Sequence, residues 1–145
     1  MIKSMSSYNS IQKNVNNFGK PVGYLDNNGN YSYVSRSKSD DLIVEIKSNY
    51  NVGVDIELLK KIDLNFLDNI CNSKEIKYIN DDIFKFYRIW TIKEAYLKML
   101  GIGLTIPLKE VEAFNITKEY YVRQYIIRSS YRKFLMSICT EQPIF

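Results

Sequence analysis

One long helical segment constrains the fold of this chain more than any other feature of the sequence. Asn80, Asp81 and Asp82 open the segment, and Gly101 closes it. Acidic residues favour the first turn of an α-helix, and glycine is common just after the last turn. We therefore predict a helix over residues 81–100, which any fold of this chain has to accommodate.

Shorter elements precede this helix. Alternating apolar residues predict a hairpin of two strands at residues 31–35 and 42–47, and a third strand at residues 52–57. Two short helices are predicted between that strand and the long helix, over residues 63–70 and 73–79, with Asp63 and Ser73 as their caps.

The segment after the long helix returns to strand patterns. Residues 110–116, 120–128 and 131–139 are predicted to form a three-stranded antiparallel meander. Phe134, Met136 and Ile138 alternate with smaller or polar residues, as they do in a strand with one buried face.

The composition limits the size of the protein and its chemistry. With 145 residues, of which 46% are hydrophobic, the chain suits one domain, residues 1–145, with a real core. It contains no histidine, which excludes Ser-His-Asp and Cys-His catalysis and histidine zinc sites. Acid–base chemistry must therefore use carboxylates, lysines or tyrosines. A metal site would have oxygen ligands, which favours magnesium.

Charge and targeting signals narrow the possible partners. The net charge of +4 suits an anionic partner, but the basic residues are scattered and form no nucleic-acid motif, so we expect no nucleic acid. No apolar run approaches the length of a membrane helix, and residues 1–7 do not resemble a signal peptide. We therefore expect a cytoplasmic protein without a membrane partner. Cys71 and Cys139 are expected to be buried free thiols.

Two carboxylates lie on one face of the strand predicted at residues 52–57. Asp55 and Glu57 are two residues apart, so they project to the same side of a strand. Neighbouring carboxylates raise each other's pKa unless a cation lies between them. The spacing is also common on strand faces that simply contact water, and that alternative stays open from these residues alone.

The long helix carries a third carboxylate beside a lysine. Glu94 and Lys98 are four residues apart and share one face of the helix, and Trp90 lies one turn before Glu94. The alternative to a functional pair is an exposed ion pair of small energetic value.

Together these segments resemble the 4′-phosphopantetheinyl transferase family. That family carries a Gly-(Val/Ile)-Asp-x-Glu strand, followed by a Trp/Phe-x-x-Lys-Glu-(Ala/Ser)-x-x-Lys helix. Both motifs are intact here, as Gly53 to Glu57 and as Trp90 to Lys98. Gly19-Lys20-Pro21 and Ser35-Arg36-Ser37 resemble two further family elements, and Ser73-Lys74-Glu75 and Gly101 to Leu104 fit less specifically. The resemblance covers residues 11–139 and is closest to the two-lobed type that activates peptide and polyketide synthases.

The resemblance implies a fold and an activity. It implies an α+β fold, in which a small antiparallel sheet packs against the long helix. It also implies magnesium-dependent transfer of 4′-phosphopantetheine from coenzyme A to a serine of an acyl or peptidyl carrier protein. Asp55, Glu57 and Glu94 would hold Mg²⁺, and Glu94 and Lys98 would be catalytic. Coenzyme A would be bound by a larger set of residues: Lys20, Pro21, Ser35, Arg36, Ser37, Lys93 and Lys98.

The chain departs from the family pattern in two places. Arg36 replaces the histidine of the family's Ser-His-Ser element, although a guanidinium still suits a phosphate. Most of the family's N-terminal lobe has no counterpart. Residues 1–50 therefore read as the end of a first lobe and residues 51–145 as a second lobe with the metal site. Because the missing neighbours would uncover Tyr31, Tyr33, Leu42, Val44 and Ile46, we expect a homo-oligomer.

Two other functions remain open. A non-catalytic homologue could bind a carrier protein or a nucleotide without turnover. A small nucleic-acid-binding protein is supported only by the basic charge.

Overall fold

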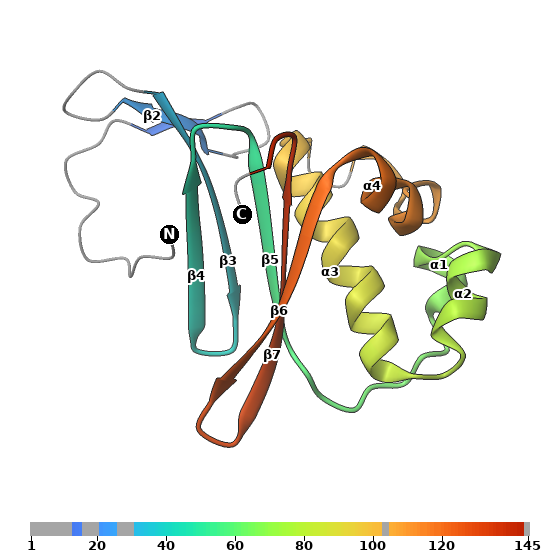
Figure 1. Ribbon diagram of the computed structural model, residues 1–145. Helices are drawn as coiled ribbons and strands as arrows, with labels where there is room; N and C mark the ends of the chain where they lie inside the picture. The colour runs from blue at the N-terminus through green and yellow to red at the C-terminus, as the bar shows by residue number, and fades with distance from the viewer. Residues whose placement is uncertain (1–12, 16–20, 26–30, 103–104, 144–145) are drawn as a thin grey trace.

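The computed structural model describes residues 13–15, 21–25, 31–102 and 105–143, which form three layers (Figure 1). The central layer is an antiparallel sheet in the order β5-β7-β6, with β5 at Val52–Leu58, β6 at Tyr121–Ser129 and β7 at Arg132–Thr140. The helix α3 (Ile83–Leu100) covers one face of this sheet, and the hairpin of β3 (Tyr31–Ser39) and β4 (Leu42–Ser48) lies against the other. The predicted α+β fold, a sheet packed by the long helix, is confirmed.

The hairpin belongs to a second antiparallel sheet. Its strand order is β1-β2-β3-β4, with β1 at Lys13–Val15 and β2 at Pro21–Leu25. The strands β3 and β4 meet in a two-residue turn, where Asp40 has a φ of 53°. Asp and Asn tolerate this left-handed conformation better than most residues do.

The ends of α3 match the prediction closely. The Asp82 side chain accepts a hydrogen bond from the backbone N–H of Lys85, so Asp82 is the N-cap. Gly101 ends the helix with a φ of 70°, a conformation that glycine adopts without steric cost.

The two short helices differ from the prediction in the start of one and the cap of the other. The helix α1 spans only Leu67–Ile70, and Asp63 instead accepts the N–H of Asn65 in a local turn that precedes it. The helix α2 spans Ser73–Ile79, as expected, but its cap is Asn72 rather than Ser73.

The predicted strand at residues 110–116 is wrong. This segment forms a 3₁₀ turn, η3 (Leu108–Glu110), and the helix α4 (Ala113–Glu119). Ala113 and Ile116, three residues apart, are both buried, which is a helical rather than an alternating spacing. The predicted meander is therefore also wrong: β6 and β7 pair as expected, and the third strand of their sheet is β5.

Two apolar clusters hold the layers together. On the helix side, α3 and the shorter helices pack against Leu135 and Cys139 of β7. On the hairpin side, Val44 and Ile46 of β4 pack against inward side chains of β5 and β7. Val44 and Ile46 are thus buried rather than uncovered as predicted, because the central sheet itself covers the hairpin. Tyr33 and Leu42 are half-buried in the same cluster, and the side chain of Tyr31 lies outside the described residues.

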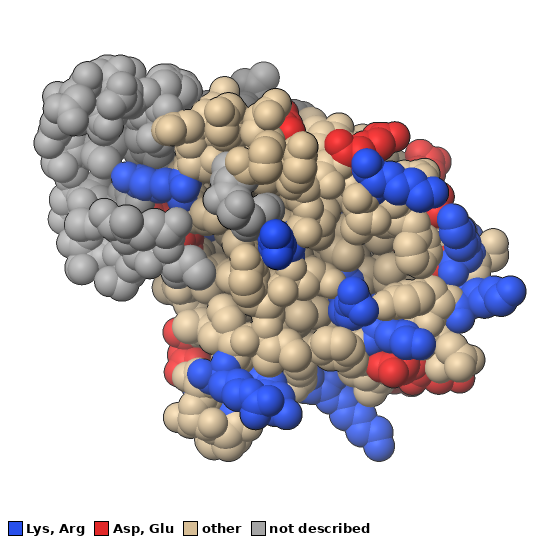
Figure 2. Space-filling view, viewed as in Figure 1, with Lys and Arg blue, Asp and Glu red and all other residues tan. Residues whose placement is uncertain are grey.

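One face of the molecule agrees with the expected charge pattern. Figure 2 shows lysine and arginine side chains in separate groups, rather than in one stripe, over the face that carries β6 and α3. Cys71 and Cys139 are free and buried, as predicted. Among the described residues, no helix is both long and apolar enough to span a membrane.

Candidate active site

A close crossing of α3 over β5 forms the site. Gly53 of β5 lies directly beneath the helix backbone, and a Cβ atom at this position would come within 1.8 Å of the carbonyl oxygen of Ala95. Only glycine allows two backbones to approach this closely. The next two residues on the same face of β5 are Asp55 and Glu57, which therefore project toward α3.

At this crossing, β5 and α3 exchange polar contacts. Lys98 Nζ donates to Asp55 Oδ1 at 2.9 Å, and Trp90 Nε1 donates to Glu57 Oε1 at 3.1 Å. Trp90, Glu94 and Lys98 follow each other at intervals of four residues, so Glu94 stands between these two contacts on the same helix face. The structure thus brings together all four residues that the sequence analysis assigned to metal binding and catalysis.

The three carboxylates share an unfavourable electrostatic environment. Burial raises the pKa of Asp55, although the nearby Lys98 opposes this shift. Burial also raises the pKa of Glu57 and of Glu94, and the negative charge of Asp55 adds to both shifts. Lys98 is paired directly with Asp55 and lowers the pKa of all three carboxylates, and Lys60 adds only the smallest of the effects on Glu57, so the cluster has room for additional positive charge.

A hard divalent cation fits the donor set of this cluster. Asp55 Oδ2 is buried and has no hydrogen-bond partner among the described residues. All the candidate ligands are carboxylate oxygens, which Mg²⁺ prefers. In the described part of the chain, however, no three acidic or cysteine side chains converge as a formed metal centre, and Lys98 is the counter-ion of Asp55. The carboxylate ligands therefore suit magnesium, while the side chains are arranged around the ion pair of Lys98 and Asp55.

A row of serines joins the hairpin to β5. The hydroxyl oxygens of Ser35, Ser37 and Ser39 accept hydrogen bonds from the backbone N–H groups of Val54, Ile56 and Leu58, at 3.0, 3.1 and 2.8 Å. We call these three residues the serine row. Ser37 also donates to Asp55 Oδ1 at 3.2 Å, so it contacts the acidic cluster directly. Ser39 was missed in the sequence, although the alternation Ser-Arg-Ser-Lys-Ser could have indicated one shared face.

Arg36 lies on the opposite face of β3 from the serine row, since successive side chains of a strand alternate. Its guanidinium binds the carboxylate of Glu45 on β4, with Nε donating to Oε2 at 2.6 Å. The structure therefore does not place Arg36 beside Ser35 and Ser37. Lys20 lies outside the described residues, and Pro21 is the first residue of β2, with a side chain that is not described.

Lys93 is not brought to the cluster either. Its side chain is only 1% exposed, and its ammonium group donates to the carbonyl oxygens of Ile70 and Leu108 and to Glu75 Oε1. An ammonium group has three N–H donors, and all three are used within the protein. The geometry therefore argues against the prediction that Lys93 binds coenzyme A.

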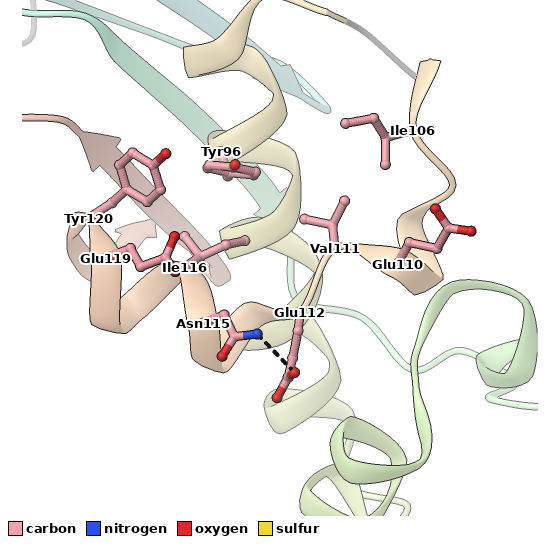
Figure 3. A pocket seen from close by; sticks show the side chains of 9 residues that line it. All are labelled: Tyr96, Ile106, Glu110, Val111, Glu112, Asn115, Ile116, Glu119 and Tyr120. Carbon is pink, nitrogen blue, oxygen red and sulfur yellow. Dashed lines mark hydrogen bonds between the residues drawn. The ribbon is translucent and has the colours of Figure 1, made fainter.

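A separate hollow lies on the other side of α3 (Figure 3). Tyr96 is two residues from both Glu94 and Lys98, which places it on the opposite helix face. The hollow has a volume of about 260 Å³ and lies between α3, α4 and the segment before α4. Several glutamates line it, and one of them, Glu112, accepts a hydrogen bond from Asn115 at 3.1 Å. The hollow is thus distinct from the acidic cluster.

The comparisons with known proteins agree with this geometry. The family description "4'-phosphopantetheinyl transferase superfamily" matches residues 51–140, more than half of the chain. The 4'-phosphopantetheinyl transferase gsp of Aneurinibacillus migulanus is 34% identical over 98 residues, which cover 64% of this chain and 39% of that protein. For ffp of Bacillus subtilis, the identity is 24% over 153 residues, or 93% of this chain and 65% of the relative.

A third relative, the transferase Sfp of Bacillus subtilis strain 168, is 24% identical over 111 residues, which cover 65% of this chain and 48% of that protein. The chain thus spans between 39% and 65% of the length of these three relatives. The matched region includes β5, α3 and therefore the whole acidic cluster. The chain belongs to the 4'-phosphopantetheinyl transferase superfamily.

Proposed function

We propose that this protein transfers 4′-phosphopantetheine from coenzyme A to a serine of an acyl or peptidyl carrier protein in a magnesium-dependent reaction. The observation that carries this proposal is the cluster of Asp55, Glu57, Glu94 and Lys98 at the crossing of β5 and α3. Membership of the superfamily supports the same reaction.

Asp55, Glu57 and Glu94 would hold the magnesium ion, which would neutralise the charge of the coenzyme A pyrophosphate when bound. In the reaction, the serine hydroxyl attacks the phosphorus that carries pantetheine, and the bond to adenosine 3′,5′-bisphosphate breaks. Glu94 would accept the serine proton directly or through water. The ammonium of Lys98 would donate to the leaving phosphate.

The remaining residues of the predicted coenzyme A site differ in how well their positions suit that role. Arg36 is 28% exposed, so its guanidinium can still reach a phosphate while it contacts Glu45. The hydroxyls of Ser35 and Ser37 already accept hydrogen bonds from backbone N–H groups of β5. These two serines would therefore contact coenzyme A only where it reaches the edge of β3. Lys20 and Pro21 are retained from the family resemblance. Lys93 is left out because its ammonium is buried and saturated.

The chain would correspond to the end of a first lobe in residues 1–50 and a second lobe in residues 51–145. In that arrangement, the coenzyme A site lies between the two parts, where Ser37 of β3 meets Asp55 of β5. We propose that the protein forms a homo-oligomer, with coenzyme A bound near a subunit boundary.

The decisive experiment is to incubate the protein with coenzyme A, Mg²⁺ and an apo carrier protein, and then to weigh the carrier by mass spectrometry. A gain of one phosphopantetheine group is expected for the parent protein and no gain for Asp55→Ala. Asp68→Ala, which removes an exposed carboxylate on α1, serves as the control and should keep full activity. Magnesium-dependent turnover that survives in Asp55→Ala would show that the site is assigned incorrectly.

A non-catalytic homologue is the second candidate. One observation favours it: among the described residues the three carboxylates do not converge as a formed metal centre, and Lys98 is the counter-ion of Asp55. It predicts binding of coenzyme A or a carrier protein in calorimetry without any change in the mass of the carrier.

A further inference from the structure

The buried ammonium of Lys93 connects α3 to segments that are far apart in the sequence. Lys93 Nζ lies 2.6 Å from the carbonyl oxygen of Ile70 at the end of α1 and 2.9 Å from that of Leu108 in η3. It also lies 2.7 Å from Glu75 Oε1 in α2. One side chain of α3 therefore fixes the helix against three other elements.

The partner carboxylate extends this connection. Glu75 is completely buried, and its Oε1 accepts the backbone N–H of Asn72 at 3.0 Å. Its Oε2 accepts the backbone N–H of Ala113, the first residue of α4, also at 3.0 Å. The buried charges are thus paired with each other and with four backbone groups, so the pair avoids the usual cost of an unpaired buried charge.

The position of Lys93 links this pair to the acidic cluster. Lys93 directly precedes Glu94, so the two side chains leave α3 on different faces, about 100° apart. A rotation of α3 that moved Glu94 or Lys98 away from β5 would have to break the contacts of Lys93 on the other face. The sheet fixes the helix through Gly53, and Lys93 fixes it from the opposite layer.

We propose that Lys93 is a positioning residue: with Glu75, it holds α3 in the rotation that presents Glu94 and Lys98 to β5. This inference rests on the proposed function for its effect on turnover. Its structural part does not, since it concerns the geometry of α3 over β5. It assigns to Lys93 a role different from binding of coenzyme A.

The single tryptophan provides a readout that does not depend on activity. Trp90 lies on α3 and donates to Glu57 at the crossing, so its emission and near-ultraviolet circular dichroism report the position of α3 over β5. Lys93→Met and Glu75→Gln should each change both signals in the folded protein. Lys85→Met, which removes a lysine nearer the start of the same helix, should change neither.

Turnover and metal binding separate positioning from substrate binding. For Lys93→Met and Glu75→Gln alike, we expect kcat to fall at least tenfold, the KM for coenzyme A to stay within about twofold, and binding of Mn²⁺ to the free protein to weaken. The double variant should lose little more than the stronger single variant, because both residues act through one contact. Glu75 is a buried anion and cannot bind a phosphate, so substrate binding cannot explain an effect of Glu75→Gln. The critical comparison is whether Glu75→Gln and Lys93→Met change kcat and KM in the same way.

The opposite pattern would overturn the proposal: unchanged Trp90 signals together with a large rise in the KM for coenzyme A in Lys93→Met alone. If Lys93→Met does not fold, Glu75→Gln carries the comparison, and unchanged Trp90 signals in that variant would also overturn it. If the parent protein shows no turnover, the proposed function fails, while the Trp90 and Mn²⁺ measurements still decide the role of Lys93.

Discussion

At the scale of single residues, the carboxylates of the acidic cluster are placed for chemistry at the expense of stability. Burial raises the pKa of Glu94 in the folded protein above its value in the unfolded chain, and Asp55 and Glu57 add to the shift. In the pH range between these two values, the folded state binds more protons. The contribution of Glu94 to stability therefore falls as pH rises from the unfolded pKa through the raised folded pKa, and it stays low above that range.

Glu94→Gln tests directly whether this carboxylate lowers stability while it supports turnover. In the absence of metal, the variant should unfold at a higher urea concentration than the parent at pH 7, because a neutral amide replaces a buried charge. The difference should vanish near pH 4, where the carboxyl is protonated in both states. Addition of Mg²⁺ should stabilise the parent but not the variant, and turnover should fall by about 10²–10⁴-fold.

Urea unfolding at both pH values, with and without Mg²⁺, measures these effects. Glu119→Gln, which changes an exposed carboxyl at the end of α4, is the matched control and should leave the response to Mg²⁺ unchanged. A lower stability of metal-free Glu94→Gln than of the parent at pH 7 would contradict the conclusion that the buried charge of Glu94 destabilises the folded protein.

At the scale of elements, the crossing of α3 over β5 depends on one missing side chain. A Cβ atom on Gly53 would meet the Ala95 carbonyl at 1.8 Å and the Met99 backbone nitrogen at 2.5 Å. Both are backbone atoms, so no rotamer change can relieve the clash. Any side chain at this position must push the helix away from the strand that carries Asp55 and Glu57.

Gly53→Ala should therefore lower the free energy of unfolding by about 3 kcal/mol, at the upper end for overpacking in a core. It should also reduce turnover in the fraction that remains folded, since Glu94 and Lys98 would move with the helix. Denaturant unfolding and the mass assay measure the two effects. Asn49→Ala, an exposed position just before β5, should change neither. Full activity in Gly53→Ala would mean that the close crossing is not required.

The elements predicted correctly are those whose signals are local. The ends of α3 follow from Asp82 and Gly101, and the hairpin follows from the alternation in β3 and β4. The helix α4 was predicted as a strand, because Val111 and Ala113 alternate with glutamates. One contact that stabilises the first turn of this helix comes from a residue far away in the sequence. The N–H of Ala113 is bound by Glu75, which is 38 residues away.

The same distinction explains the site. Asp55 with Glu57, and Glu94 with Lys98, share faces that follow from the period of a strand or a helix, so they could be assigned from the sequence. Lys93 sits in the same motif as Glu94, but its partners come from α1, α2 and η3. No local pattern reveals such a contact. Sequence reasoning therefore predicted which faces the carboxylates share, and it assigned this lysine a role that its geometry does not support.

At the scale of the whole molecule, exposed side chains lie along an edge of the central sheet. Among the described strands, β6 pairs with β7 alone, and its side chains Tyr121, Tyr125 and Ile126 are between 42% and 51% exposed. The hairpin strands, which the sequence had suggested as the exposed surface, are instead covered by β5 and β7. The edge of β6 is thus the better candidate for self-association.

We expect the protein to form a homo-oligomer at low micromolar concentration, and Ile126→Lys to shift it toward the monomer, because a charge on an edge strand opposes pairing. Sedimentation velocity measures both. Phe84→Lys, which places the same charge at an exposed apolar position on α3 rather than on a strand, is the control and should leave the assembly unchanged. A monomeric parent that still modifies the carrier would show that one chain makes a complete site.

The serine row has a consequence for how the two sheets are aligned. Ser35, Ser37 and Ser39 each bind a residue nineteen positions further along the chain, so β3 and β5 run in the same direction with a fixed offset. A slip by one residue would set Arg36 and Lys38, whose side chains only donate, against the N–H donors of β5. A slip by two would leave one N–H without a hydroxyl. The alternation of acceptors and donors along β3 therefore permits only one alignment of β3 with β5. This alignment also fixes the position of Ser37 against Asp55.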